Sequence, residues 1–177
     1  YRVELNGING NQLDVITLEN REPVHINEVP LHVQNAFLAI EDRKFRTHHG
    51  FDFWRLGRAV LSNVTGSAKE GGSSITQQLA KNAFLSPERS FDRKLKEAIL
   101  AIEIERKYTK DEILENYLNT IYFGNGSYGI KNASMKYFDK EPKDLTVAEA
   151  AILASIRKSP TKYSPAKNYK NAIERQR

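Results

Sequence analysis

The sequence has no cysteine among its 177 residues, which excludes disulfide bonds and thiolate metal sites and leaves the compartment open. Long hydrophobic runs are also missing. The longest are AILAI at 98–102 and AAILASI at 150–156, well short of the ~20 residues that span a membrane. The chain begins at Tyr1 and ends at Arg177, and we expect it to be a piece of a longer protein whose anchors lie outside it.

The composition is that of a folded protein with a basic surplus. Hydrophobic residues make up 40% and charged residues 28%, and the length suits one compact domain. The net charge of +5 favours an anionic partner, such as a phosphate-bearing substrate, nucleic acid or an acidic membrane, although an inert basic surface fits equally well. The sequence shows no basic patch interleaved with aromatics and no recognition-helix pattern, so we expect no nucleic-acid partner.

Periodicity and turn signals predict a mainly α fold after a short N-terminal arm. Asn6-Gly7 and Asn9-Gly10 are hairpin-turn signals, so we expect a β-hairpin or extended arm over 1–27. The remaining residues, 28–177, form the main domain. Helices are predicted at about 30–45, 56–61, 74 onward, 86–108, 109–123, 127–137 and 146–158, with a turn-rich mobile loop at 63–72. Gly124 is predicted to end the fifth of these helices, and Thr109 with Glu112 and Thr146 with Glu149 have the spacing of capping boxes. The helix at 86–108 carries Phe91, Leu95, Ile99 and Ile102 on one face.

The stretch EDRKFRTHHGFD, 41–52, contains the first candidate for catalysis. Glu41 follows Ile40 at the edge of an apolar helix face, where partial desolvation strengthens a carboxylate as a base. A solvated pair of Glu41 and Asp42 neutralised by Arg43 and Lys44 is the alternative.

The histidines of this stretch and the aromatic residues around its end indicate a site less clearly. Adjacent His48 and His49 diverge, and no other ligands suggest zinc, so we expect them to donate hydrogen bonds or to structure the turn at Gly50. The aromatic residues that follow, Phe51, Phe53 and Trp54, are either core or an apolar lip that touches lipid.

The stretch GGSSITQQLAKN, 71–82, predicts a capped helix start. Ser74 and Gln77 have the spacing of a capping box, and Ile75 and Leu79 can face the core. A polar face of Ser74, Gln77, Gln78 and Lys81 at a helix N-terminus suits hydroxyl-rich or phosphate-bearing ligands. A simple capped, soluble helix explains Ser74 and Gln77 as well.

The segment 89–107 groups cations around one carboxylate. The charged residues are Arg89, Arg93, Lys94, Lys96 and Glu97. They form either a salt-bridged surface, since Arg93 and Glu97 lie four apart, or a phosphate cradle in which Glu97 orients the cations or holds a divalent metal.

These stretches together resemble the peptidoglycan glycosyltransferase domain of class A penicillin-binding proteins and of monofunctional transglycosylases, glycosyltransferase family 51. The resemblance spans residues 41 to 160 in ordered motifs. The matching residues are Glu41, Asp42, Phe45, His48, Gly50 and Asp52; Gly71–Asn82; Arg93, Lys94 and Glu97; Lys110, Ile113–Glu115 and Tyr117–Asn119; and, more weakly, Lys158–Pro160. Ser74 stands where the family usually has threonine, which preserves the capping hydroxyl.

The resemblance implies a lysozyme-like helical lobe with a smaller membrane-facing lobe, and lipid II and the growing glycan chain as substrates. It implies the outer face of the bacterial cytoplasmic membrane, an anchor helix upstream of Tyr1, and often a transpeptidase domain downstream of Arg177. Other proteins of cell-wall synthesis and division become candidate partners.

On this basis we assign Glu41 as the general base and Glu97 as a second catalytic carboxylate that organises cations. Lys81, Arg89, Arg93 and Lys94 are expected to bind the donor diphosphate, and Ser73, Gln77 and Gln78 to position sugar or phosphate oxygens. Asp42 is expected to support Glu41 or the acceptor. A divalent metal, Mg²⁺ or Mn²⁺, at Glu97 is the candidate cofactor, with no organic cofactor expected.

The residue chemistry favours transfer over hydrolysis. A lipid diphosphate leaves without a proton donor and needs cations, whereas a glycosidase needs a general acid beside a second carboxylate. Two rival functions stay open: a lysozyme-like muramidase that cleaves glycan strands, and a non-enzymatic basic module that binds acidic lipid or nucleic acid.

Overall fold

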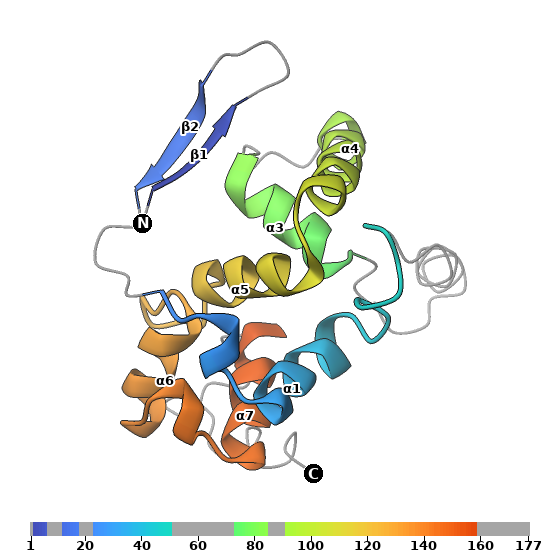
Figure 1. The fold of residues 1–177 in the computed structure, drawn as a ribbon. Helices are drawn as coiled ribbons and strands as arrows, with labels where there is room; N and C mark the ends of the chain where they lie inside the picture. The colour runs from blue at the N-terminus through green and yellow to red at the C-terminus, as the bar shows by residue number, and fades with distance from the viewer. Residues whose placement is uncertain (1, 7–11, 18–22, 51–72, 85–90, 159–177) are drawn as a thin grey trace.

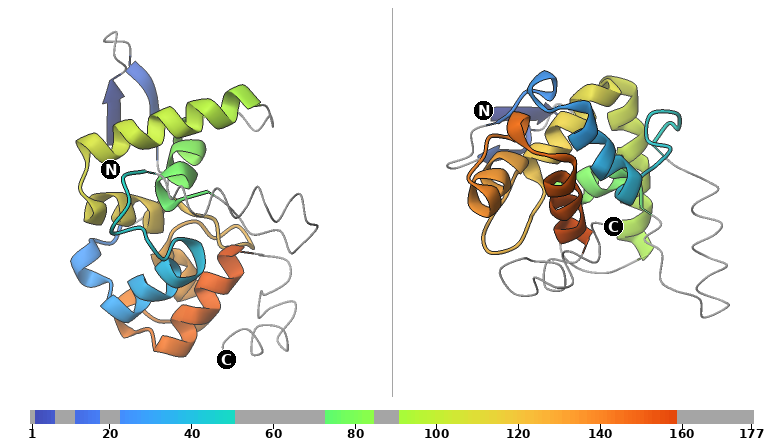
Figure 2. Two further views of the ribbon diagram at one scale, coloured as in Figure 1. Left: turned by 90° about the vertical axis from the view of Figure 1, so that its right-hand side faces the viewer. Right: turned by 90° about the horizontal axis from the view of Figure 1, so that it is seen from below.

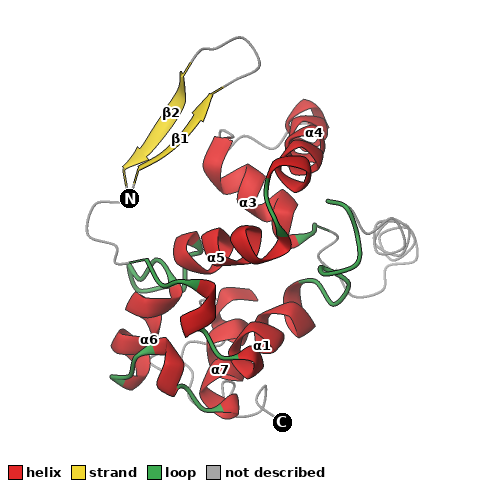
Figure 3. Ribbon diagram, viewed as in Figure 1, coloured by secondary structure: helices red, strands yellow, loops and turns green. Residues whose placement is uncertain are grey.

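The computed structural model describes residues 2–6, 12–17, 23–50, 73–84 and 91–158 (Figure 1). The predicted helix at 56–61, the loop at 63–72, Phe51, Phe53, Trp54 and Arg89 lie outside these ranges. Within them the chain is mainly helical, which confirms the predicted fold class (Figure 3). The elements are β1 Arg2–Asn6, β2 Gln12–Thr17, η1 Ile26–Glu28, α1 Leu31–Glu41, α3 Ile75–Phe84, α4 Phe91–Lys107, α5 Lys110–Thr120, α6 Ile130–Phe138, η2 Pro142–Asp144 and α7 Val147–Lys158.

The predicted N-terminal hairpin is present. Strand β1 pairs antiparallel with β2, with Arg2 opposite Thr17 and Leu5 opposite Leu13. The register is irregular between Val3 and Leu5. This two-stranded ribbon lies beside α3, which β2 contacts, and away from α1, α6 and α7 (Figure 1).

Capping residues fix the starts of two helices as the sequence predicts. At α5, Thr109 Oγ1 accepts from the Glu112 amide at 3.3 Å, while Glu112 Oε2 accepts from the Thr109 amide at 2.7 Å. Thr146 and Glu149 make the same reciprocal pair before α7. Each box satisfies amide groups that a helix start leaves without partners.

Helix α5 ends at Thr120, earlier than the predicted end at Gly124. Ile121 is already extended, and Tyr122 then forms a β-bridge with Tyr128 across a tight turn. Gly129 closes this turn with a φ of +78°, and a Cβ there would lie 2.7 Å from the Asn119 carbonyl oxygen. Glycine is therefore required at this position.

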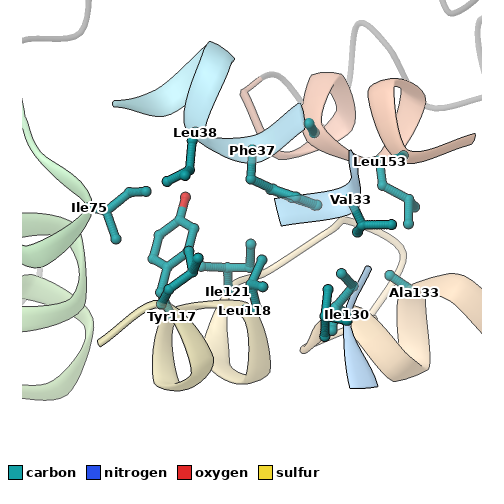
Figure 4. Packing of buried hydrophobic residues seen from close by; sticks show 14 of the residues in the cluster. Val33, Phe37, Leu38, Ile75, Tyr117, Leu118, Ile121, Ile130, Ala133 and Leu153 are labelled. Atoms are coloured by element: carbon teal, nitrogen blue, oxygen red, sulfur yellow. The ribbon is translucent and has the colours of Figure 1, made fainter. Parts of the chain in front are cut away.

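The core forms where α1 and α7 pack together and meet α5 and α6. Phe37 of α1, Tyr117 of α5 and Leu153 of α7 are fully buried, and Figure 4 shows them with their neighbours. Phe37 also packs edge-on against Phe123, with ring centroids 5.8 Å apart. Helix α3 lies against both α5 and α4, so it connects the core to α4.

Helix α4 packs against its neighbours through the side that carries Glu97, Ala101 and Ile104. Leu95, Ile99 and Ile102 share a face that is 38–55% exposed, while Glu97 and Ala101 are buried. Figure 2 shows α4 as a long helix beside α3 at the edge of the helical core. No helix in the described ranges is long and apolar enough to cross a membrane.

Candidate active site

Glu41 is the last residue of α1, and its burial matches the predicted desolvation. The residue is 8% exposed. Its Oε2 accepts a hydrogen bond from Gln78 Nε2 of α3 at 2.9 Å. The Gln78 amide oxygen in turn accepts from a guanidinium N–H of Arg157, in the last turn of α7, at 2.5 Å. Three helices therefore meet at this carboxylate.

Asp42, the C-cap of α1, connects this helix to the start of α3. Its Oδ2 accepts from the Ile75 amide at 3.1 Å and lies 2.8 Å from His48 Nε2. An ionised carboxylate only accepts, so the His48 ring donates through Nε2. The expectation that His48 makes a hydrogen bond is confirmed, and Asp42 satisfies a first-turn amide of α3 where the helix dipole favours an anion.

The predicted capping box at α3 is also confirmed. The Ser74 amide donates to Gln77 Oε1 at 2.9 Å, and Ser74 Oγ accepts from the Gln77 amide at 3.1 Å. Ser74 Oγ donates in addition to the Gly50 carbonyl at 2.7 Å. Ser74 and Gln77 are both buried, so the polar face expected from helical spacing is reduced to Gln78 and the exposed Lys81.

Tyr117 brings a buried phenol close to Glu41. It rises from α5 between Ile75 and Leu38, with its hydroxyl directed away from α5 (Figure 4). Burial raises the pKa of Tyr117 well above its usual range; the negative charge of Glu41 acts in the same direction and the Arg157 guanidinium in the opposite one. The phenol therefore stays protonated at neutral pH.

A second cluster joins α4 to the residues just before α3. Lys94 Nζ donates to Ser73 Oγ at 2.7 Å and to Glu97 Oε1 at 2.7 Å. Glu97 is 1% exposed, while the Lys94 side chain is 46% exposed. Glu97 Oε2 is buried and has no hydrogen-bond partner among the described residues. The lysine thus presents its charge to solvent over a buried carboxylate.

The structure groups the predicted site residues in two places connected by α3. Glu41 and Gln78 belong to the first, and Ser73, Lys94 and Glu97 to the second. Arg93 is half-buried on α4 one residue before Lys94. Gln77 is held in the capping box, and Asp42 in the contact with α3 and His48.

Sequence reasoning missed Arg157 and a second, partly buried network. Thr76 Oγ1 donates to Glu105 Oε1 at 2.5 Å, and Lys110 Nζ donates to the same oxygen at 2.8 Å and to the His48 carbonyl at 2.6 Å. The sequence places Lys110 in a family motif but does not indicate these contacts. Nothing in the local sequence signals Arg157, because its partner Gln78 lies 79 positions away.

The donor atoms at Glu97 are few for a metal centre. No group of three or more His, Asp or Glu side chains that could hold an ion occurs in the part of the chain that the structure describes. Glu97 supplies one carboxylate, and Lys94 already occupies one of its oxygens. An ion here would take its other ligands from substrate phosphates and water, as Mg²⁺ commonly does.

Comparison with known proteins gives consistent matches. The family model described as Transglycosylase matches residues 9–177. Penicillin-binding protein 1F of Bacillus subtilis (strain 168) is 56% identical over 158 residues, 89% of this chain and 22% of that protein. Penicillin-binding protein 1A of Aquifex aeolicus (strain VF5) is 46% identical over 173 residues, 97% of this chain.

A crystal structure of penicillin-binding protein 1A from Haemophilus influenzae aligns with 99% of this chain and 18% of its own, with a TM-score of 0.47 and 24% identity. The chain thus spans less than a quarter of the length of the two curated relatives, since it covers 22% and 24% of them.

Proposed function

This chain belongs to the transglycosylase family, and we propose that it polymerises lipid II into β-1,4 glycan strands with release of undecaprenyl diphosphate. The resemblance to the glycosyltransferase domain of class A penicillin-binding proteins is confirmed, and the chain is an enzyme domain of that class. One observation carries the proposal: α3 connects a buried carboxylate, Glu41, to a cluster in which Lys94 faces solvent.

Glu41 is the general base in this proposal. It accepts the proton of the acceptor's 4-hydroxyl as that oxygen bonds to the anomeric carbon of the donor. The bond between this carbon and the diphosphate oxygen breaks, and its electron pair leaves with the lipid diphosphate. Attack opposite the leaving group inverts the α-linked donor to a β-linked product.

The cations stabilise the charge that develops on the leaving diphosphate. Lys94 is the best-supported of them, because Ser73 and Glu97 fix its ammonium group. Lys81 and Arg93 are proposed to add charge, together with Arg89, which lies outside the described residues. Ser73 is proposed to contact the substrate, while the buried Gln77 and Asp42 are proposed to support the residues that contact it.

A polymerisation assay with purified lipid II tests the reaction. Glycan chains should form with this chain, and Glu41→Gln should abolish them while lipid II binding is largely retained. Polymer made by Glu41→Gln at the unmodified rate would overturn the assignment of the base. Soluble fragments released from purified cell wall, with no polymer from lipid II, would instead support a muramidase.

The same assay with and without a chelator tests the proposed Mg²⁺ or Mn²⁺. The buried Glu97 Oε2 is the atom of this chain that would contact such an ion, which would supply positive charge at the diphosphate. Activity unaffected by the chelator would remove the metal from the proposal and leave the lysine and arginine side chains as the sole cations.

The location follows from the substrate. Lipid II is a membrane-borne donor, so we propose that the enzyme acts at the outer face of the bacterial cytoplasmic membrane. In this proposal the parent protein has an anchor helix before Tyr1, and a smaller lobe of the domain faces the bilayer. Binding to vesicles that carry lipid II, compared with vesicles that lack it, tests this placement.

A further inference from the structure

An ordered chain of hydrogen bonds leads from α7 through α3 to the carboxylate at the end of α1. Arg157 donates to Gln78 Oε1 at 2.5 Å, and Gln78 Nε2 donates to Glu41 Oε2 at 2.9 Å. These three residues are far apart in the sequence, at separations of 37 and 79 positions. Only the packing of α1, α3 and α7 brings them together.

The partners of Gln78 determine which way its amide group points. A guanidinium group has donors and no acceptor, so it must face the amide oxygen. An ionised carboxylate has acceptors and no donor, so it must face the amide NH₂. With a cation on one side and an anion on the other, Gln78 has a single orientation that satisfies both neighbours, and a rotated amide would lose both hydrogen bonds.

We infer that Gln78 and Arg157 are positioning residues that hold the Glu41 carboxylate in the orientation needed to remove the acceptor's proton. This inference rests on the proposed function. Arg157 acts through Gln78, which fixes the Glu41 oxygen that it contacts. Gln78 thus has a role different from the substrate contact that its place in the sequence motif predicts.

The surroundings of the three residues keep this geometry in place. Glu41 is buried, and Gln78 and Arg157 are partly buried. Arg157 directly follows the fully buried Ile156, so the packing of α7 fixes the backbone from which the arginine side chain extends. Small displacements of a reacting group have large effects on rate, because about 1 Å can cost 10²-fold.

Steady-state kinetics of lipid II polymerisation test the inference. Gln78→Ala and Arg157→Met should each lower kcat by about tenfold or more and leave KM for lipid II within about twofold. Arg157→Lys should recover part of the loss, since it keeps the charge without the planar fork. Arg106→Met, on an exposed arginine near the end of α4, is the matched control and should keep both constants.

A double variant separates action through Gln78 from independent effects. If Arg157 works only through Gln78, then Gln78→Ala combined with Arg157→Met should be no slower than Gln78→Ala alone. A multiplied loss would show that the two residues act separately and would overturn the inference. A raised KM with unchanged kcat would also overturn it, because that result marks Gln78 as a substrate contact.

Two further measurements keep the outcomes distinct. The Tm of each variant, measured by circular dichroism, should lie within a few degrees of the Tm of the original chain. A lower kcat then reflects altered geometry and not unfolding. The original chain and Glu41→Gln run in the same assay: no polymer from the original chain overturns the proposed function and this inference together. Polymer from the original chain with unchanged kcat in the Gln78 and Arg157 variants overturns this inference alone.

Discussion

Glu41 and Glu97 are both buried carboxylates, yet they are held in opposite ways. Glu41, at the end of α1, accepts from the neutral amide of Gln78. Glu97, on α4, accepts from the ammonium group of Lys94. The contact with Gln78 is a hydrogen bond from a neutral amide, whereas the contact with Lys94 also pairs two opposite charges. Burial alone would give both residues the same role, and their partners give them different ones.

The surroundings of the two carboxylates differ as well: those of Glu41 are enclosed, and those of Glu97 include an exposed lysine. Three helices meet at Glu41, and a buried phenol, Tyr117, lies close by. The ammonium group over Glu97 is carried by a side chain that is 46% exposed, so it can meet a ligand from solvent. The first arrangement suits a group that must be oriented for proton transfer, and the second suits recognition of an anion.

Among substitutions that keep the charge, the largest effect is expected from Glu41→Asp. Loss of one methylene keeps the charge but withdraws the carboxylate from Gln78 and from the acceptor. We expect kcat to fall by about 10²-fold with KM little changed, because misplacement of a base by about 1 Å has an effect of that size. Initial rates of lipid II polymerisation measure it.

Glu103→Asp on α4 is the matched control for this change and should keep the original rate. Equal losses in both variants would mean that shortening any glutamate of the fold reduces activity. That result would remove the distinction between Glu41 and the other carboxylates.

Glu97→Gln should act on binding more than on turnover. The substitution keeps the volume and removes the charge that fixes Lys94, and a hydrogen bond between charged groups is worth about 1.5–3 kcal/mol. We expect kcat/KM for lipid II to fall by about tenfold, mostly through KM. Direct binding of lipid II should weaken in Glu97→Gln and stay near the original value in Glu41→Gln; the reverse result would exchange the two roles.

The two sites also show which features could be predicted from the sequence and which could not. Local signals were sufficient for the caps at Ser74, Thr109 and Thr146, since each box needs only residues three apart. The apolar edge beside Glu41 was likewise enough to predict its burial.

Contacts across helices could not be predicted in this way. Arg157 reaches Gln78 only once α7 packs on α1, and Gln77 is buried because α3 has neighbours on both sides. The apolar stripe of Leu95 and Ile99 reads as a core face in the sequence, but α4 packs through the opposite side. Periodicity identifies the faces of a helix, and packing decides which of them is covered.

Raising the salt concentration should change kcat/KM by a smaller factor than the Glu41 and Glu97 substitutions do, and it should act on the Lys94 site. Exposed charges are screened and buried contacts much less so, so kcat/KM should fall about threefold between about 0.05 and 0.5 M salt. This dependence should be weaker in Lys94→Met, while Arg106→Met, which also removes one exposed positive charge, should retain it. Equal salt slopes in all three proteins would mean that Lys94 does not attract the substrate.

The smallest effect of any of these substitutions is expected from Ser73→Ala. This serine accepts one of the two hydrogen bonds that fix Lys94, at 2.7 Å, and Glu97 supplies the other. A single hydrogen bond at a partly exposed site contributes about 0.5–1.5 kcal/mol, so kcat/KM should fall by about threefold. Because Glu97 keeps Lys94 in place, Ser73→Ala in the Glu97→Gln background should cost more than in the original chain. Identical losses in the two backgrounds would show that Ser73 contacts the substrate directly and does not act through the lysine.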